Sequence, residues 1–392
     1  MPSYWFSDGT VRRPAALAVL PGAADVVVIG GGILGVAATY WLAKSGVNVV
    51  LVEATELAWG ASGRNAGFML CGSSPLEDAL LIGSVLREEG INADLQQTGH
   101  LALAGSREIE EKIHQEIARR PPSAPLLQWL DHSQCQELVG LRISYRFSGG
   151  RWFPSGRTIH PVRFVYGLAE AAVRHGASIL LNTAVLAVGN AAGSRIRLMT
   201  SRGAVLARQV VLACNFKTGA FLPELQHAFT PVRGQVVCTS RLPSLFRVGL
   251  AVDWGTLYWR QADDGAVVLG GYHNLDPHAE ATTEEGLNPA IQAALQRFLP
   301  ETFLGFPEFE VQQRWSGIMD ETIDGKPIAG PSPDGREIWM IAGCGGHGLP
   351  PALGLGKALA ESMLQGKPST ALSPCDPARF RSLTRSRSWQ KS

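Results

Sequence analysis

Three glycine-rich stretches hold the residues whose types and spacing are best suited to chemistry. The first, residues 30–35 (GGGILG), fits the pattern G-x-G-x-x-G, and Glu53 follows 21 residues after Gly32. Gly30 permits a tight turn, Gly32 lets the backbone approach a pyrophosphate, and Gly35 allows a helix to pack closely on a strand. Glu53 can accept hydrogen bonds from ribose hydroxyls, and its charge disfavours a 2′-phosphate. This spacing predicts a dinucleotide site that does not take NADP.

The second stretch, residues 60–67 (GASGRNAG), combines small residues with polar side chains. Backbone N–H groups in such a segment can point at phosphates, because no bulky side chain keeps a ligand away. Ser62 and Arg64 add side-chain donors. We interpret the segment as a phosphate-binding loop, with an ordinary surface loop as the alternative.

The third stretch, residues 342–351 (AGCGGHGLPP), places Cys344 and His347 among glycines. A metal site needs further ligands nearby, and a reactive thiol needs a partner that lowers its pKa; neither is evident from the sequence. Ala358 stands where a GxxxxGK[ST] phosphate loop requires Ser or Thr, and no G-x-S-x-G elbow surrounds Ser62. We therefore predict a backbone turn between a strand and a helix, without a metal.

Short apolar runs predict the elements that position these stretches. Strands are expected at 25–29 and 48–52 with a helix at 36–44 between them, which together make a βαβ unit. The uncharged run 26–43 is long enough to suggest a membrane span, but its glycines favour a strand, a turn and a helix start. Further strands are predicted at 178–181, 208–214 and 338–342, and further helices at 162–175 and 350–364.

The remaining segments predict a second, mixed lobe. Strand candidates lie at 234–239, 256–260 and 266–270, and the DDG sequence before the last of them is typical of a hairpin turn. The fold class is therefore α/β, with a discontinuous Rossmann-like nucleotide-binding domain and a mixed α/β substrate domain built on an antiparallel sheet. The expected limits are 1–75, 151–220 and 316–392 for the first domain and 76–150 and 221–315 for the second.

The composition excludes several classes of function. The 392 residues include 35 Lys and Arg against 34 Asp and Glu, so the net charge of +1 favours neither nucleic acid nor an anionic membrane. Six cysteines are scattered without a C-x-x-C pair, which indicates neither a disulfide framework nor a zinc site. The first residues lack the apolar segment of a signal peptide. We expect a cytoplasmic protein whose basic run 379–392 is a solvated tail.

Five stretches, taken in order, resemble FAD-dependent amine and amino-acid oxidases, the family of D-amino acid oxidase, glycine oxidase and monomeric sarcosine oxidase. They are GGGILG with Glu53, WGASGRNAGF, GRTIHPVRFVYGLAEAAVRHGA, RWSGIMDETIDGKPIAG and IAGCGGHGLPPALGLGKALAESML. The resemblance covers residues 3–366. The WGASGRN and RWSG…DGKP pieces are most similar to the γ-glutamylputrescine oxidase branch.

The resemblance implies FAD as cofactor. The link to the protein is expected to be non-covalent, since Gly317 stands near the position where sarcosine-type enzymes attach flavin to a Cys. The residues that the resemblance and the motifs place at the cofactor are Gly30, Gly32, Ile33, Leu34, Gly35, Glu53, Ala54, Ser62, Gly63, Arg64, Asn65, Ala66, Gly67, Phe68, Val185, Ala213, Cys214, Asn215, Gly345, Gly346, His347, Gly348, Leu349 and Pro350.

Candidate catalytic residues are fewer. His273, in Gly271-Tyr272-His273, matches a family position that faces the substrate; it either orients the amine, accepts its proton, or is an ordinary histidine at a strand end. Tyr258 and Trp315 either form an aromatic wall for an amine cation or pack in the core. Leu269 stands where sarcosine-type enzymes carry an oxygen-activating Lys.

Three further residues bear on the substrate. Met69 and Met319 are expected to line its site, and Arg260 pairs either with a distal substrate carboxylate or with a nearby Asp. Met319 and Pro350 replace an Arg and a Lys that bind the substrate carboxylate in relatives. Because a buried carboxylate without a cation costs several kcal/mol, this favours larger amines over small amino acids.

The resemblance implies an enzyme that oxidises the C–N bond of an amine or amino acid. A hydride passes to flavin N5, the imine hydrolyses, and the flavin is reoxidised by oxygen, giving peroxide, or by another acceptor. The alternatives are an FAD dehydrogenase subunit of an opine- or amino-acid-oxidising complex and a flavin-binding subunit without a free amine substrate. The expected partners are thus a small molecule and an electron acceptor, with homo-oligomer or hetero-oligomer both open, and neither nucleic acid nor a membrane span.

Overall fold

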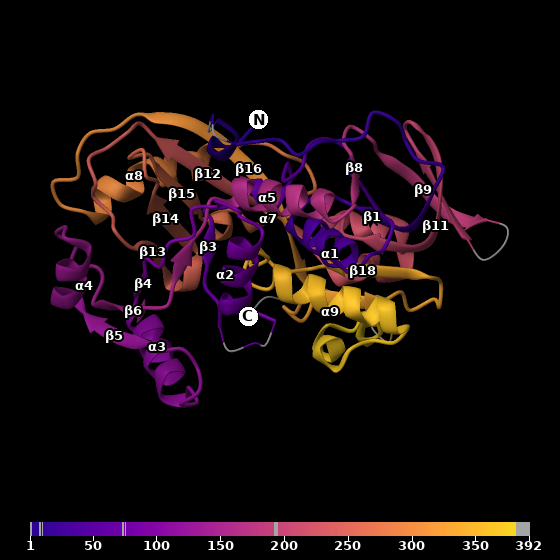
Figure 1. Ribbon diagram of the computed structural model, residues 1–392. Coiled ribbons are helices and arrows are strands. Elements are labelled where there is room, and N and C mark those ends of the chain that lie inside the picture. Colours follow the sequence, from indigo (N-terminus) through magenta and orange to yellow (C-terminus); the bar gives the residue numbers. More distant parts are fainter. Residues whose placement is uncertain are drawn as a thin grey trace.

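The computed structural model describes residues 2–7, 9, 11–72, 74, 76–191 and 195–381. Figure 1 shows two lobes side by side, one containing β1, β11 and β18 and the other containing β12, β14 and β15. We call these the first lobe and the second lobe. Each is built on a large sheet, and β3 (Phe68–Met69) pairs with β7 (Arg157–Thr158) in a small third one.

The sheet of the first lobe runs in the order β17-β18-β11-β1-β2-β8, with β10 and then β9 attached to β11. The core strands β18, β11, β1, β2 and β8 are parallel, and β1, β2 and β18 are buried along most of their length, as expected for strands covered on both faces. The strands are β1 (Ala23–Ile29), β2 (Val49–Val52), β8 (Ser178–Leu180), β9 (Val185–Ala191), β10 (Arg195–Thr200), β11 (Gly203–Leu212), β17 (Ile328–Pro331) and β18 (Ile338–Ala342).

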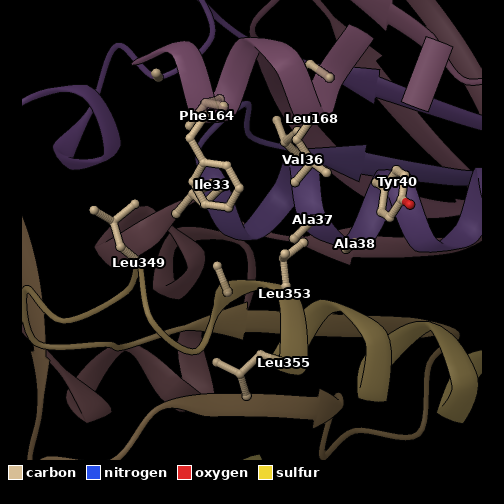
Figure 2. Packing of buried hydrophobic residues seen from close by; sticks show 14 of the residues in the cluster. Ile33, Val36, Ala37, Ala38, Tyr40, Phe164, Leu168, Leu349, Leu353 and Leu355 are labelled. Carbon is tan, nitrogen blue, oxygen red and sulfur yellow. The ribbon is translucent and has the colours of Figure 1, made fainter. Parts of the chain in front are cut away.

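Three helices make the core of this lobe: α1 (Ile33–Lys44), α5 (Pro161–Arg174) and α9 (Ala352–Gln365). Figure 2 shows Ile33 and Val36 of α1 facing Phe164 of α5 on one side, with Leu353 of α9 below. A Cβ atom at Gly356 would lie 2.9 Å from backbone and side-chain atoms of Ala37, so the glycine lets α9 approach α1 closely.

The second sheet runs in the order β16-β12-β15-β14-β13-β4-β6-β5 and is antiparallel except between β13 and β4. Helix α8 (Pro289–Thr302) packs on one face of this sheet, against Val237, Trp259 and Leu269, and the opposite face of the sheet turns toward the first lobe. The strands are β4 (His100–Leu103), β5 (Gln128–Asp131), β6 (Gly149–Phe153), β12 (Phe229–Thr239), β13 (Gly249–Val252), β14 (Leu257–Gln261), β15 (Val267–Gly271) and β16 (Val311–Thr322). The remaining helices are α2 (Ala79–Glu88), α3 (Arg107–Arg119), α4 (His132–Val139), α6 (Thr218–Phe221) and α7 (Pro277–Glu280).

These elements confirm the α/β fold class, and each of the strands and helices predicted for the βαβ unit is present within a few residues. The uncharged run 26–43 is divided between β1, a turn and α1, and no helix in the described residues is both long and apolar enough to span a membrane. The expected domain limits at 150/151 and 315/316 fall inside β6 and β16. Both strands pair along their length within the second sheet, which a sequence pattern does not reveal. Residues 382–392 of the basic tail lie outside the described residues.

Glu89 joins α1 to α5 at the end of α2. Its carboxylate accepts hydrogen bonds from the Tyr40 hydroxyl (2.8 Å) and Arg174 (3.1 Å), and His175 Nε2 lies 2.8 Å away. Burial alone would raise the pKa of Glu89, but the bonds from His175, Tyr40 and Arg174 outweigh it and bring the pKa to about 2. A carboxylate with a lowered pKa stabilises the folded state above its unfolded pKa of about 4.3, and the effect is lost as the pH falls through about 2.

Replacing Glu89 with Gln should lower the free energy of unfolding by about 1–3 kcal/mol near neutral pH, because charged hydrogen bonds become neutral ones. The difference from the unmodified protein should shrink as the pH falls from about 5 toward 2. Urea unfolding at several pH values measures this. Glu88→Gln is the matched control, since Glu88 is exposed and bridges only Lys44 (3.2 Å) among the described residues. An equal loss in both variants would contradict the role of Glu89.

Candidate cofactor and substrate site

The turn after β1 depends on glycine at two positions. Gly30 has a φ of +111°, and a Cβ atom there would lie 2.4 Å from the Ala213 carbonyl oxygen at the end of β11. A Cβ atom at Gly35 would lie 2.0 Å from the Gly30 carbonyl oxygen. Both distances are far below van der Waals contact, so the backbone forms a tight cradle that only glycine allows.

Glu53 holds this cradle in place. Its carboxylate accepts the Gly31 N–H (2.7 Å) and the Thr55 N–H (2.8 Å). The Ser62 hydroxyl reaches the same turn and accepts the Ile33 N–H at the start of α1 (2.9 Å). The first two glycine-rich stretches therefore meet at the N-terminus of α1, where the helix dipole favours an anionic group.

The loop 60–67 is ordered by Asn65. Its amide nitrogen donates to the carbonyl oxygens of Ala61 and Ser62 (2.9 Å each), and its amide oxygen accepts the Gly67 N–H (2.8 Å). The indole N–H of Trp5 donates to the Asn65 carbonyl (2.6 Å). These hydrogen bonds use both the amide nitrogen and the amide oxygen of the Asn65 side chain, so Asn65 holds the loop in its conformation.

Arg64 is buried and reaches out of this loop to the second lobe. Its guanidinium donates to the carbonyl oxygens of Trp59 and Ser316 (2.7 Å each) and lies 2.9 Å from a carboxylate oxygen of Glu285. Its Nη2 atom has no partner among the described residues. Most of the donors predicted for a phosphate are thus already used, and Nη2 is the atom left for a ligand.

Three of the predicted cofactor segments bind to the edge strand β16. The carbonyl oxygens of Ser316, Ile318 and Asp320 accept hydrogen bonds in turn. The donors are Arg64 of the loop 60–67 (2.7 Å), Asn215 at the end of β11 (2.9 Å) and the Gly345 N–H (2.9 Å). Alternate carbonyls of an antiparallel edge strand point away from its partner, so the spacing of two residues follows from the strand geometry.

The loop after β18 has glycines in left-handed conformations, with φ of +75° at Gly343, +54° at Gly345 and +83° at Gly346. A Cβ atom at Gly346 would lie 2.7 Å from Met319 Sδ. The structure thus brings the predicted substrate residue Met319 against the loop predicted to meet the cofactor ring. Burial raises the pKa of Cys344 well above its ordinary value, so its thiol is neutral and unsuited to act as a nucleophile.

An aromatic wall lies on the face of the second sheet that turns toward the first lobe. The ring of Phe68 meets His100 edge-on (5.2 Å between centroids) and Tyr258 edge-on (6.2 Å). Burial raises the pKa of Tyr258 to about 12 and lowers that of His100 to about 3, so both are neutral near pH 7. His100 was not predicted from the sequence; a histidine inside the apolar run His100–Leu103 was the available signal.

Comparison with known proteins decides the family. The family described as FAD dependent oxidoreductase matches residues 25–362. The chain belongs to this family. A probable oxidoreductase OrdL of Rhizobium meliloti is 28% identical over 93% of this chain and 89% of that protein. Gamma-glutamylputrescine oxidoreductase of Escherichia coli is 26% identical over 87% of this chain and 84% of its own length.

The solved structures agree in fold. Glycine oxidase from Geobacillus kaustophilus superposes with a TM-score of 0.79 at 23% identity, covering 94% of this chain and all of that one. The family confirms the predictions of FAD as cofactor and of an oxidoreductase. No group of three or more potential ligands in the described part of the chain is arranged to hold a metal ion.

The residues present fit FAD. The glycine cradle at Gly30–Gly35 would be filled by any side chain, and buried Arg64 Nη2 is a donor without a partner in the described part of the chain. Other predicted cofactor residues leave part of their surface uncovered: Gly30, Gly32, Leu34, Glu53, Ala54, Ser62, Asn65, Phe68, Val185, Ala213, Cys214, Asn215, Gly345, Gly346, His347 and Gly348. The buried ones are Ile33, Gly35, Gly63, Arg64, Ala66, Gly67, Leu349 and Pro350.

Three predicted substrate or catalytic residues lie in the interior instead. Met69 and Trp315 are each 1% exposed, and the indole N–H of Trp315 donates to the Arg64 carbonyl (2.9 Å). Arg260 is buried, stacks on Trp5 (4.7 Å) and donates to the Ile159 carbonyl (3.1 Å). All three side chains pack against neighbouring residues in this structure, and Arg260 Nε has no partner among the described residues. Their roles toward a substrate stay predictions.

His273 is half-buried and begins the short turn His273–Leu275, directly after Tyr272 in a left-handed conformation (φ +61°). Asp320, which the sequence analysis did not select, is buried on β16 directly after Met319. Its signal in the sequence was an acid following the apolar pair Ile318-Met319 in the RWSGIMDETIDGKP motif.

Gly35→Ala should abolish FAD binding or weaken it by at least about 100-fold, because the added methyl group collides with the Gly30 carbonyl and overpacking displaces the cradle. Fluorescence titration of the apoprotein with FAD measures the affinity. Gly60→Ala is the control within a cofactor segment, since a Cβ atom at Gly60 meets nothing within 4 Å. Unchanged affinity in Gly35→Ala would contradict the assigned cradle.

Proposed function

We propose that this enzyme oxidises the C–N bond of an amine that carries no carboxylate next to the reacting carbon. The observation that carries the proposal is Met319, an apolar side chain set against the Gly346 turn at the position where the resemblance places a carboxylate-binding Arg. The two buried guanidinium groups of Arg64 and Arg260 already donate within the protein, and each keeps one nitrogen, Nη2 of Arg64 and Nε of Arg260, without a partner among the described residues. A substrate carboxylate bound beside Met319 would lose its hydration without gaining a cation.

The chain's own residues prepare the amine. Phe68 and Tyr258 form an apolar wall, which disfavours a charged ammonium group and so selects the neutral amine with its lone pair free. The neutral Tyr258 hydroxyl can exchange a hydrogen bond with that amine, and His273 orients it from the end of β15. When bound, FAD supplies the acceptor for a hydride from the α-carbon. No strong general base is required for this chemistry.

An anaerobic reduction assay tests the proposal. The holoenzyme is mixed with pairs that differ only in the α-carboxylate: isobutylamine and valine, benzylamine and phenylglycine, putrescine and ornithine. In at least one pair the amine should bleach the flavin absorbance by at least about 10-fold faster than the amino acid, since an unpaired carboxylate costs more than about 1.4 kcal/mol. Faster reduction by the amino acids, or none by any compound, would overturn the proposal.

Met319→Arg should shift the preference toward the amino acid of each pair by at least about 10-fold in kcat/KM, because the new guanidinium pairs with the carboxylate. Met319→Leu is the matched control and should keep the preference of the unmodified enzyme. An arginine variant that binds FAD normally but shows no shift would mean that the carboxylate does not approach this residue.

A second candidate is an FAD dehydrogenase subunit within a larger complex. One of the subunits of opine oxidase from Agrobacterium tumefaciens is 25% identical over 78% of this chain and 84% of that protein, which supports it. Leu269, at the position of the oxygen-activating Lys in sarcosine-type enzymes, is buried against α8. Peroxide formed in step with substrate consumption favours the oxidase; reduction of an added dye without peroxide favours the dehydrogenase.

A further inference from the structure

We propose that Asp320 is a positioning residue that holds the loop 343–348 against β16 and places a carboxylate directly behind it. The inference rests on the proposed site in one respect: it takes this loop as the segment that faces the flavin ring. It does not depend on which amine is oxidised.

Two backbone N–H groups of the loop bind to this one residue. The Asp320 carboxylate accepts the Gly343 N–H (2.7 Å), and the Asp320 carbonyl accepts the Gly345 N–H (2.9 Å). Gly343 and Gly345 both have positive φ, so their N–H groups turn toward the strand only in this unusual backbone conformation. Asp320 is therefore the anchor that selects the conformation of the loop.

The neighbouring residues fix the two sides of the loop. Thr322, two positions further along β16, would meet a Cβ atom at Gly343 within 2.5 Å, so the loop lies directly on the strand. Met319 meets Gly346 from the other side. The loop is thus enclosed between β16 side chains, and a movement of Asp320 is transmitted to the turn predicted to contact the cofactor.

An ionised carboxylate at this buried position is energetically unfavourable. Asp320 is 6% exposed, and burial raises its pKa to about 7 despite the opposing N–H groups of Gly343 and Cys344. An acid with a raised pKa favours folding at low pH, and this contribution is lost as the pH rises through about 7. Perturbed carboxyls of this kind gather at functional sites, and an asparagine would accept the same hydrogen bonds without the cost of a buried charge.

Other titratable groups around the loop remain the same in the variants described below. The thiols of Cys344 and Cys375 both have raised pKa values because of burial, so they stay neutral through the range in which Asp320 titrates. Glu77 also acts on Cys344, and its carboxylate accepts the Gly72 N–H (2.7 Å). A difference in flavin midpoint potential between the unmodified protein and the Asp320→Asn variant therefore reports the charge at this one position.

The test uses the FAD-loaded full chain without substrate. Asp320→Asn should keep the FAD affinity within about 3-fold, because its amide oxygen still accepts the loop N–H groups, whereas Asp320→Ala should lose at least about 10-fold. The midpoint potential of the flavin in Asp320→Asn should be more positive than in the unmodified protein at about pH 8.5 and equal to it at about pH 5.5, where Asp320 is neutral. Glu321→Gln, the next residue on β16, is the control and should change neither quantity.

Two results would overturn the inference. One is normal FAD affinity in Asp320→Ala, which would show that the loop does not need its anchor. The other is a potential in Asp320→Asn that matches the unmodified protein at both pH values, which would show that the carboxylate does not act on the flavin. If Asp320→Ala does not fold, the midpoint potential of Asp320→Asn, compared with that of the unmodified protein, still tests the inference. If the amine assay failed, the FAD affinity and the flavin midpoint potential of the Asp320 variants would still test this inference.

Discussion

The outer edge of β16 determines how the two lobes meet. One edge of this strand pairs with β12 in the second sheet, and the carbonyls along its other edge accept hydrogen bonds from three separate segments of the first lobe. The acceptors are alternate residues of a rigid strand, so the donors from the loop 60–67, the end of β11 and the loop 343–348 are set at fixed intervals. An exposed edge that would otherwise pair with another chain is at the same time protected.

The arrangement explains why the site combines tight backbone turns with few free charges. Glycine turns at Gly30 and Gly343 let the backbone approach its neighbours, and a charged side chain such as Arg64 is committed to joining the lobes. The proposed substrate face is left with Phe68, Tyr258 and Met319, whose groups are apolar or neutral. Recognition must then come mainly from shape and from a few hydrogen bonds, which suits an amine held in its neutral form.

Predictions based on neighbouring residues were largely confirmed. The βαβ unit, the hairpin at Asp263-Asp264-Gly265 and the strand–turn–helix around residues 342–351 depend on periodicity and on glycine, which act within about ten residues. The structure buries Trp315, Met69 and Arg260, which the sequence analysis offered as candidates for the substrate or catalytic site, with core packing as the alternative for Trp315 and pairing with an Asp for Arg260. An aromatic ring or a guanidinium looks the same in the sequence whether it faces a ligand or the core, because burial depends on partners far away along the chain.

The sequence by itself determined the dinucleotide fold, its FAD family and the positions of the glycine turns, since these require particular residue types at short spacings. Only the tertiary structure decided which donors remain available, how far β16 extends into the second sheet and that Asp320 lies behind the loop 343–348. The bond between Arg64 and Ser316 joins residues 252 positions apart, and no local pattern specifies such a pairing. It arises because the packed lobes bring a buried donor to a strand edge whose carbonyls need partners.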